Sequence, residues 1–212
     1  MNRKNAPRRG RGYFAGYLKH YTKKNNVLLF LCALFLVGVL LGTLLLRSAD
    51  ADTWDILGKL TSGYLSSRKD ATLLQNFWSA LGPMLLFLVG VFLCGFSAVS
   101  QPLEVLVPLF RGLGYGISIA SLYAGYGTSA IGYVALFMLP GMVFTTLALC
   151  FCCRESLRLS GSFFAAMNGQ DKGFYSLRAY LARYVTSAIV CVLAALLEAA
   201  LYFVFAGFFS LG

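Results

Sequence analysis

Three ionisable residues, Glu104, Arg111 and Glu198, lie inside stretches that are apolar enough to sit in a bilayer. Ionisable side chains at membrane depth are costly and usually face protein or water, so each marks a candidate functional site. Glu104 and Arg111 are seven residues apart, which is two helical turns, so they share a helix face. Arg111 and Glu198 have side chains long enough to meet. We interpret Arg111 and Glu198 as an ion pair that fixes the register of their two spans. A proton- or ion-coupled site is the alternative.

Most catalytic chemistry is excluded by composition. The single histidine, His20, lies in a basic segment, which excludes His-based metal sites and Ser–His dyads within the membrane. Every aspartate falls in an expected loop, which argues against an intramembrane aspartyl protease, and no GxxxxGK(S/T) phosphate loop is present. Cys150, Cys152 and Cys153 lack a CxxC pair or a nearby histidine, and we interpret them as small apolar residues at a helix end. We therefore expect no enzyme, no catalytic residue, no metal and no cofactor.

The composition is that of an integral membrane protein. Of the 212 residues, 58% are hydrophobic and 12% are charged, whereas a soluble domain carries about 25% charged residues. Several apolar runs reach or approach the roughly 20 residues that a transmembrane helix needs. We predict an all-α, polytopic membrane protein with about five transmembrane helices plus amphipathic interfacial helices.

The net charge of +10 could suggest a nucleic-acid partner, but its distribution suggests a membrane. Eight basic residues lie in residues 1–26 and five in residues 154–184, so 13 of the 18 Lys and Arg flank apolar spans. The positive-inside rule explains this pattern. We expect membrane lipids as partners, no nucleic acid, and a cytoplasmic N-terminus.

The expected organisation has four parts. They are a basic cytoplasmic segment (1–26), a transmembrane helix (27–46), an extracytoplasmic loop (47–78), and a four-helix membrane domain (79–209) with a cytoplasmic loop (154–184). The expected spans of that domain are 79–99, 103–124, 130–153 and 185–209. Two alternatives stay open: the basic segment is an amphipathic helix or a disordered tail, and residues 103–124 cross the membrane or re-enter it.

Further residues are candidates for structure or interaction. Trp54, Leu57 and Leu60 recur at helical spacing in the 47–78 loop, where an extracytoplasmic partner would dock. Gly112, Gly114 and Gly116 allow close helix packing. Pro140 predicts a kink at Leu139. Arg154, Glu155 and Arg158 form a local charge cluster that suits a headgroup anchor or a docking spot.

Four segments together resemble the stage II sporulation protein M family. They are Gln101-Pro102-Leu103, then Phe110-Arg111-Gly112-Leu113-Gly114-Tyr115-Gly116-Ile117-Ser118, then Leu139-Pro140, and finally Arg154-Glu155-Ser156-Leu157-Arg158-Leu159-Ser160. The match covers roughly residues 27–209, and its most specific part is 101–160.

The resemblance implies a membrane component of the engulfment machinery of sporulating bacteria. Such a component anchors and recruits stage II sporulation proteins D and P, which cut peptidoglycan. The family offers no agreed catalytic residues. A small transporter or permease-like subunit that uses Glu104, Arg111 and Glu198 is the alternative function.

Overall fold

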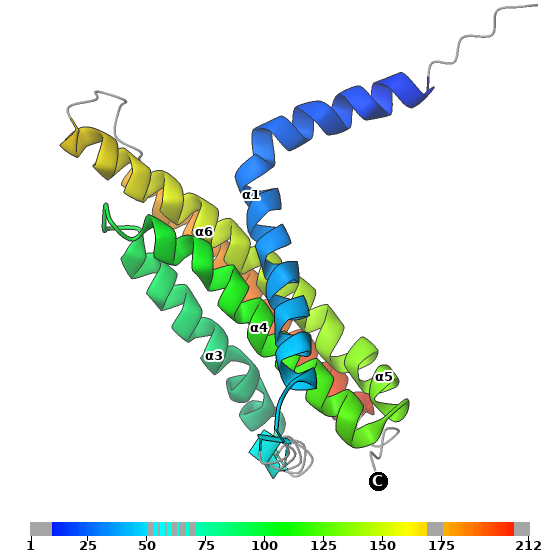
Figure 1. Cartoon of the computed structure of the whole chain (residues 1–212). Coiled ribbons are helices and arrows are strands. Elements are labelled where there is room, and N and C mark those ends of the chain that lie inside the picture. The colour runs from blue at the N-terminus through cyan, green and yellow to red at the C-terminus, as the bar shows by residue number, and fades with distance from the viewer. Residues whose placement is uncertain are drawn as a thin grey trace, which may run out of the picture.

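Long apolar runs surrounded by lipid must satisfy their backbone hydrogen bonds internally, and a helix does so within one segment. In the computed structural model, every described element is accordingly a helix (Figure 1). The structure describes residues 10–50, 53, 54, 56, 57, 59, 60, 63, 67, 71–168 and 176–205, with side chains only from residue 26 to residue 204.

The helices follow one another in simple order. They are α1 (Gly10–Arg47), α3 (Leu73–Cys94), α4 (Gln101–Tyr126), α5 (Ser129–Tyr133), the π-helical turn η1 (Val134–Met138), α6 (Leu139–Met167) and α7 (Leu177–Phe205). Five stretches of the described chain are long and apolar enough to cross a membrane: 26–47, 73–94, 101–126, 129–167 and 177–204. The predicted all-α, polytopic membrane fold is confirmed.

Several boundaries differ from the sequence-based prediction. The second span begins at Leu73, six residues before the expected start, because Thr72 and Gln75 form a capping box in which each side chain accepts a hydrogen bond from the other residue's backbone N–H. At the other end of the bundle, α6 continues to Met167 and α7 starts at Leu177, so helix occupies much of the segment expected as a loop.

Two open alternatives become clearer. α4 is one unbroken helix of 26 residues despite Pro108, and its length of roughly 39 Å exceeds the hydrocarbon core, which favours a full span over re-entry. In the basic segment, residues from Gly10 onward are helical and turn away from the bundle (Figure 1); residues 1–9 lie outside the described residues.

The expected break near Leu139 takes the form of a π-helical turn. Pro140 has no N–H to donate into the helical ladder, and the backbone N–H of Leu139 bonds to the carbonyl of Val134, five residues back. α5, η1 and α6 together make one span.

Four glycines let α1 lie directly on α4. A methyl group added at Gly112 would lie 2.2 Å from the carbonyl oxygen of Phe35, and one at Gly116 would lie 2.2 Å from that of Val39. The same holds in the other direction: a methyl group added at Gly38 or Gly42 of α1 would lie 2.2 or 2.4 Å from a backbone carbonyl oxygen of α4. The atoms met are backbone atoms, so no side chain can move aside. This is the close approach that small residues permit between membrane helices.

The cysteines pack as small apolar residues. Cys150, Cys152 and Cys153 are buried in α6 beside Cys191 of α7, and all carry free thiols. They lie in a cluster with Leu31, Met84, Leu88 and other apolar side chains.

Candidate functional site

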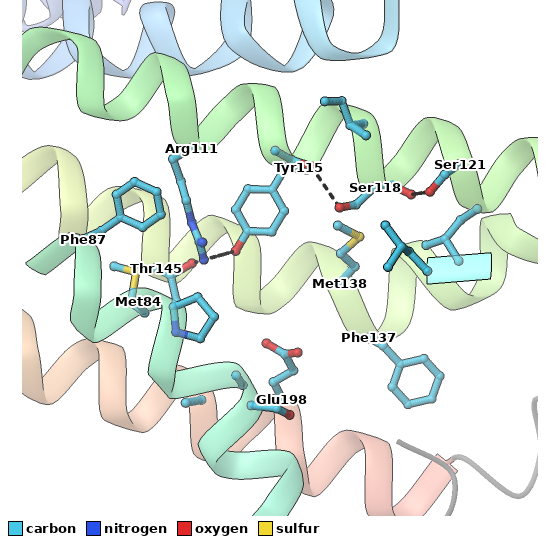
Figure 2. Close-up of a pocket in the computed structure, with 18 of the residues that line it drawn as sticks. Met84, Phe87, Arg111, Tyr115, Ser118, Ser121, Phe137, Met138, Thr145 and Glu198 are labelled. Atoms are coloured by element: carbon cyan, nitrogen blue, oxygen red, sulfur yellow. Dashed lines mark hydrogen bonds between the residues drawn. The ribbon is translucent and has the colours of Figure 1, made fainter. Parts of the chain in front are cut away.

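A cavity of about 600 Å³ lies among α3, α4, the α5–η1–α6 span and α7 (Figure 2). Its walls are mainly apolar, with Met84 and Phe87 on α3 and Phe137 on η1. Two ionisable side chains line it, Arg111 from α4 and Glu198 from α7. A largely apolar cavity with a few polar groups is the usual form of a small-molecule site.

Aromatic rings hold the Arg111 guanidinium in place. Its Nη2 donates a hydrogen bond to the Tyr115 hydroxyl at 2.9 Å. Its central carbon lies 4.6 Å from the centre of the Tyr115 ring and 5.3 Å from that of Phe87, within the range of cation–π attraction. The Tyr115 hydroxyl lies 3.4 Å from the Thr145 hydroxyl, which in turn donates to the carbonyl of Gly141 at 2.7 Å. The cation therefore belongs to a short polar chain from α4 to α6.

Glu198 enters the cavity from the opposite side (Figure 2). Gly141 leaves room for it, because a methyl group at Gly141 would lie 2.8 Å from its carboxylate oxygen. The expected Arg111–Glu198 pair does not form: among the described residues, the contacts of Arg111 are with Tyr115 and Phe87. Sequence spacing predicted that the two long side chains could meet, but it could not show that Tyr115 and Phe87 would contact the guanidinium instead.

Glu104 lies away from the cavity, although it shares α4 with Arg111. It is fully buried in the first turn of α4, where the positive end of the helix dipole favours a carboxylate. One carboxylate oxygen accepts a hydrogen bond from Ser100 at 3.1 Å. The other has no hydrogen-bond partner among the described residues. The structure thus separates Glu104 from Arg111 and Glu198.

Side-chain hydroxyl groups of α6 and α7 donate hydrogen bonds to backbone carbonyls in the last turn of α3. The final carbonyls of a helix lack partners within it, and here side chains from elsewhere supply them. Ser156 donates to the Val91 carbonyl at 3.0 Å and Tyr180 to the Phe92 carbonyl at 3.3 Å. In the following turn, Ser160 donates to the Ser97 carbonyl at 2.7 Å. α6 and α7 are thereby fixed to the α3–α4 turn.

The 154–158 charge cluster ties α6 to α7. Glu155 is buried, and its two carboxylate oxygens form ion pairs with Nη1 of Arg158 at 2.9 Å and with Nη1 of Arg183 of α7 at 2.6 Å. Arg154 lies further away, at 3.9 Å. Glu155 and Arg158, two members of the charge cluster predicted from the sequence, form an i,i+3 ion pair, and the carboxylate is buried in the protein interior. Sequence reasoning missed Arg183 because its distance from Glu155 along the chain carries no local signal.

The remaining candidates fall into different places. Gly114 does not join Gly112 and Gly116 at α1: nothing lies within 4 Å of a methyl group added there, and it lines the cavity. Residues two apart on a helix lie on different sides of it, so the three glycines could not all pack against the same neighbour.

Two of the candidates in the 47–78 segment, Leu57 and Leu60, also line the cavity. The third, Trp54, donates its backbone N–H to the carbonyl of Asp50. The described residues between 53 and 67 are helical, as the spacing of Trp54, Leu57 and Leu60 predicts. The sequence also predicts a helix cap at Asp52, with Asp55 and Tyr64 at helical spacing after it, but these three residues lie outside the described residues.

Tyr115, Thr145 and Gly141 were not among the sequence-based candidates. Tyr115 was recoverable, because residues four apart on a helix are neighbours. Thr145 and Gly141 required knowledge of how α6 faces α4.

Within the described part of the chain, no group of three or more His, Cys, Asp or Glu side chains is placed to hold a metal ion. No protein-family model, curated protein or solved structure matches the chain.

Proposed function

We propose that the protein is a membrane scaffold of the sporulation engulfment machinery, which anchors peptidoglycan-degrading partners in a bacterial cell membrane. One observation carries the proposal: the segments that resemble the stage II sporulation protein M family mainly build joints between helices. Gly112 and Gly116 let α1 pack directly on α4. Ser156 bonds to the last turn of α3, Ser160 bonds to the turn that follows it, and Glu155 links α6 to α7. A rigidly joined bundle suits an anchor.

The proposed partners are stage II sporulation proteins D and P. We place the basic segment at the N-terminus in the cytoplasm and the 47–78 segment outside, where those partners act. Ile56 and Leu60 of that segment are 60% and 64% exposed, so they offer apolar surface for docking.

Affinity capture from sporulating cells tests this proposal. The full chain is solubilised in a mild detergent and captured, and co-purified proteins are identified by mass spectrometry. We expect cell-wall hydrolases with the wild-type chain, fewer with Ile56→Gln, which is exposed and lies outside the cavity lining, and an unchanged amount with Thr53→Ala, an exposed control in the same segment. Capture that recovers no cell-wall enzyme at all would contradict the scaffold.

A second candidate, a small transporter or permease-like subunit, is favoured by one observation. Arg111 and Glu198 both line the cavity, on opposite walls, and both lie in stretches apolar enough to cross a membrane, where ionisable residues often mark a substrate pathway. Such a protein needs the cavity to accept a ligand, so the binding experiment described next also tests this candidate.

A further inference from the structure

The Arg111 guanidinium has unused hydrogen-bonding capacity. A guanidinium carries five N–H donors, and among the described residues only Nη2 has a hydrogen-bond partner, the Tyr115 hydroxyl. The Nε atom is buried without one. The Arg111 side chain is half-buried. Although Glu198 lines the same cavity, no ion pair joins Arg111 to a carboxylate among the described residues. Withdrawing a cation from water without a charged partner and most of its hydrogen bonds is costly. The position therefore calls for an acceptor with negative charge.

The cavity provides the space for such a group. Its volume of about 600 Å³ falls in the range of pockets that enclose small organic ligands. Gly114 contributes no side chain to the wall beside Arg111, and nothing lies within 4 Å of where its methyl group would be. The Tyr115 hydroxyl lies on the same side as the guanidinium (Figure 2). It accepts a hydrogen bond from Arg111, so its own proton can be donated to an oxyanion.

The cavity opens between α3 and α4. Several of its lining residues on these helices are themselves exposed: Ser79, Pro83, Phe110, Gly114 and Ser118. They lie within two of the five stretches that are long and apolar enough to cross a membrane, so in a bilayer this opening would face lipid. A ligand entering there would come from the lipid phase, and its apolar part would contact Met84 and Phe87.

We propose that this cavity binds an amphiphile with an oxyanion head, a phosphate or a carboxylate, whose head contacts Arg111 and Tyr115 and whose apolar part lies between α3 and α4. Planar oxyanions and phosphates match the donor geometry of a guanidinium. The inference is independent of the scaffold, and it names the ligand class for the permease-like candidate.

Binding to the detergent-solubilised full chain tests the proposal. The probes are dihexanoyl phosphatidic acid, dihexanoyl phosphatidylcholine with the same tails, and inorganic phosphate, each titrated by isothermal calorimetry. We expect phosphatidic acid to bind at least about tenfold more tightly than phosphatidylcholine, since charge-assisted bonds to arginine are strong. Equal affinity for the two lipids, or no binding of any probe, would overturn the proposal. Tight binding of inorganic phosphate would support the oxyanion site but identify its source as aqueous.

Variants locate the site. Arg111→Gln should weaken phosphatidic acid binding at least about tenfold, and Arg111→Lys should weaken it less, because charge remains while the planar donor pair is lost. Arg47→Gln, the same charge change at the exposed end of α1, should leave affinity unchanged. An equal loss with Arg47→Gln would mean general attraction to a basic protein and would refute the site.

A cavity-filling variant guards against a misfolded Arg111→Gln protein. Gly114→Leu adds bulk at the cavity wall, at a position where nothing lies within 4 Å of the added Cβ. Gly90→Leu is its control, because the Cβ position of Gly90 is equally open but Gly90 lies outside the cavity lining. We expect Gly114→Leu to abolish binding and Gly90→Leu to retain it. Binding that survives Gly114→Leu would exclude this cavity. Failure of this experiment would leave the scaffold proposal untouched, because partner capture is measured separately.

Discussion

At the scale of single residues, Glu104 and Glu155 are two buried carboxylates with different support. Glu104 has one hydroxyl donor and the start of a helix. Glu155 has two arginines at hydrogen-bonding distance, whose side chains remain 41% and 46% exposed. Exposed ends let those arginines keep part of their hydration, which lowers the cost of burying the pair. Glu155 is therefore the stronger tie between helices.

We predict that Glu155→Gln and Arg183→Gln are coupled. Each should destabilise the protein, and a double-mutant cycle should give an interaction free energy of about 1–2 kcal/mol, reduced from that of a fully buried pair by the exposure of Arg183. Thermal unfolding in detergent measures it. Arg178→Gln, an exposed position on the same helix, is the control and should change stability little. Strictly additive effects of Glu155→Gln and Arg183→Gln would show that the contact contributes nothing.

Residue chemistry was only partly predictable from the sequence. The Glu155–Arg158 pair follows from local spacing and is confirmed. The surroundings of Arg111 could not be predicted from local spacing, because Phe87 and Thr145 come from other helices, and packing sets how those helices are rotated about their axes. Periodicity identifies an apolar face of a helix. Because lipid and the protein interior are both apolar, it cannot tell whether that face contacts lipid or another helix.

At the scale of helices, the contrast between Gly112 and Gly114 gives a direct test. Gly112→Ala places a methyl group against the α1 backbone and should cost about 1–3 kcal/mol through overpacking. Gly114→Ala meets nothing and should be neutral or slightly stabilising, because alanine is the better helix former. Thermal unfolding in detergent of the two purified variants compares them. Equal stability of both would show that α1 does not rest on Gly112 in the membrane.

Helix number was predictable from the sequence, and helix ends were less so. Five apolar stretches set the count, as predicted. The start of α3 was placed too late because Thr72 and Gln75 look like loop residues until their capping box is considered. The expected spans 103–124 and 130–153 leave the glycine-rich segment 125–129 between them, and Gly127 has φ of 56° there, a conformation that glycine adopts readily.

For the whole molecule, three of the five stretches long and apolar enough to cross a membrane separate the 47–78 segment from the α6–α7 connection, so we predict that the two lie on opposite sides of the membrane. With the basic side in the cytoplasm, a reporter enzyme active only outside the cytoplasm should be active when fused after Leu60 and inactive when fused after Met167. Fusions to a reporter that fluoresces only in the cytoplasm should give the opposite pattern. Activity after Met167 with none after Leu60 would invert the proposed orientation.

The pairing of α1 with α4 also has a consequence for synthesis. About 80 residues, including all of α3, separate the end of α1 from the end of its partner α4. At roughly 5–20 residues per second, a ribosome needs about 4–16 s to complete that stretch. During this interval Gly38 and Gly42 face lipid without their partner, and such glycine pairs readily associate with other helices. The nascent chain must therefore be kept from pairing with a second copy until α4 is inserted.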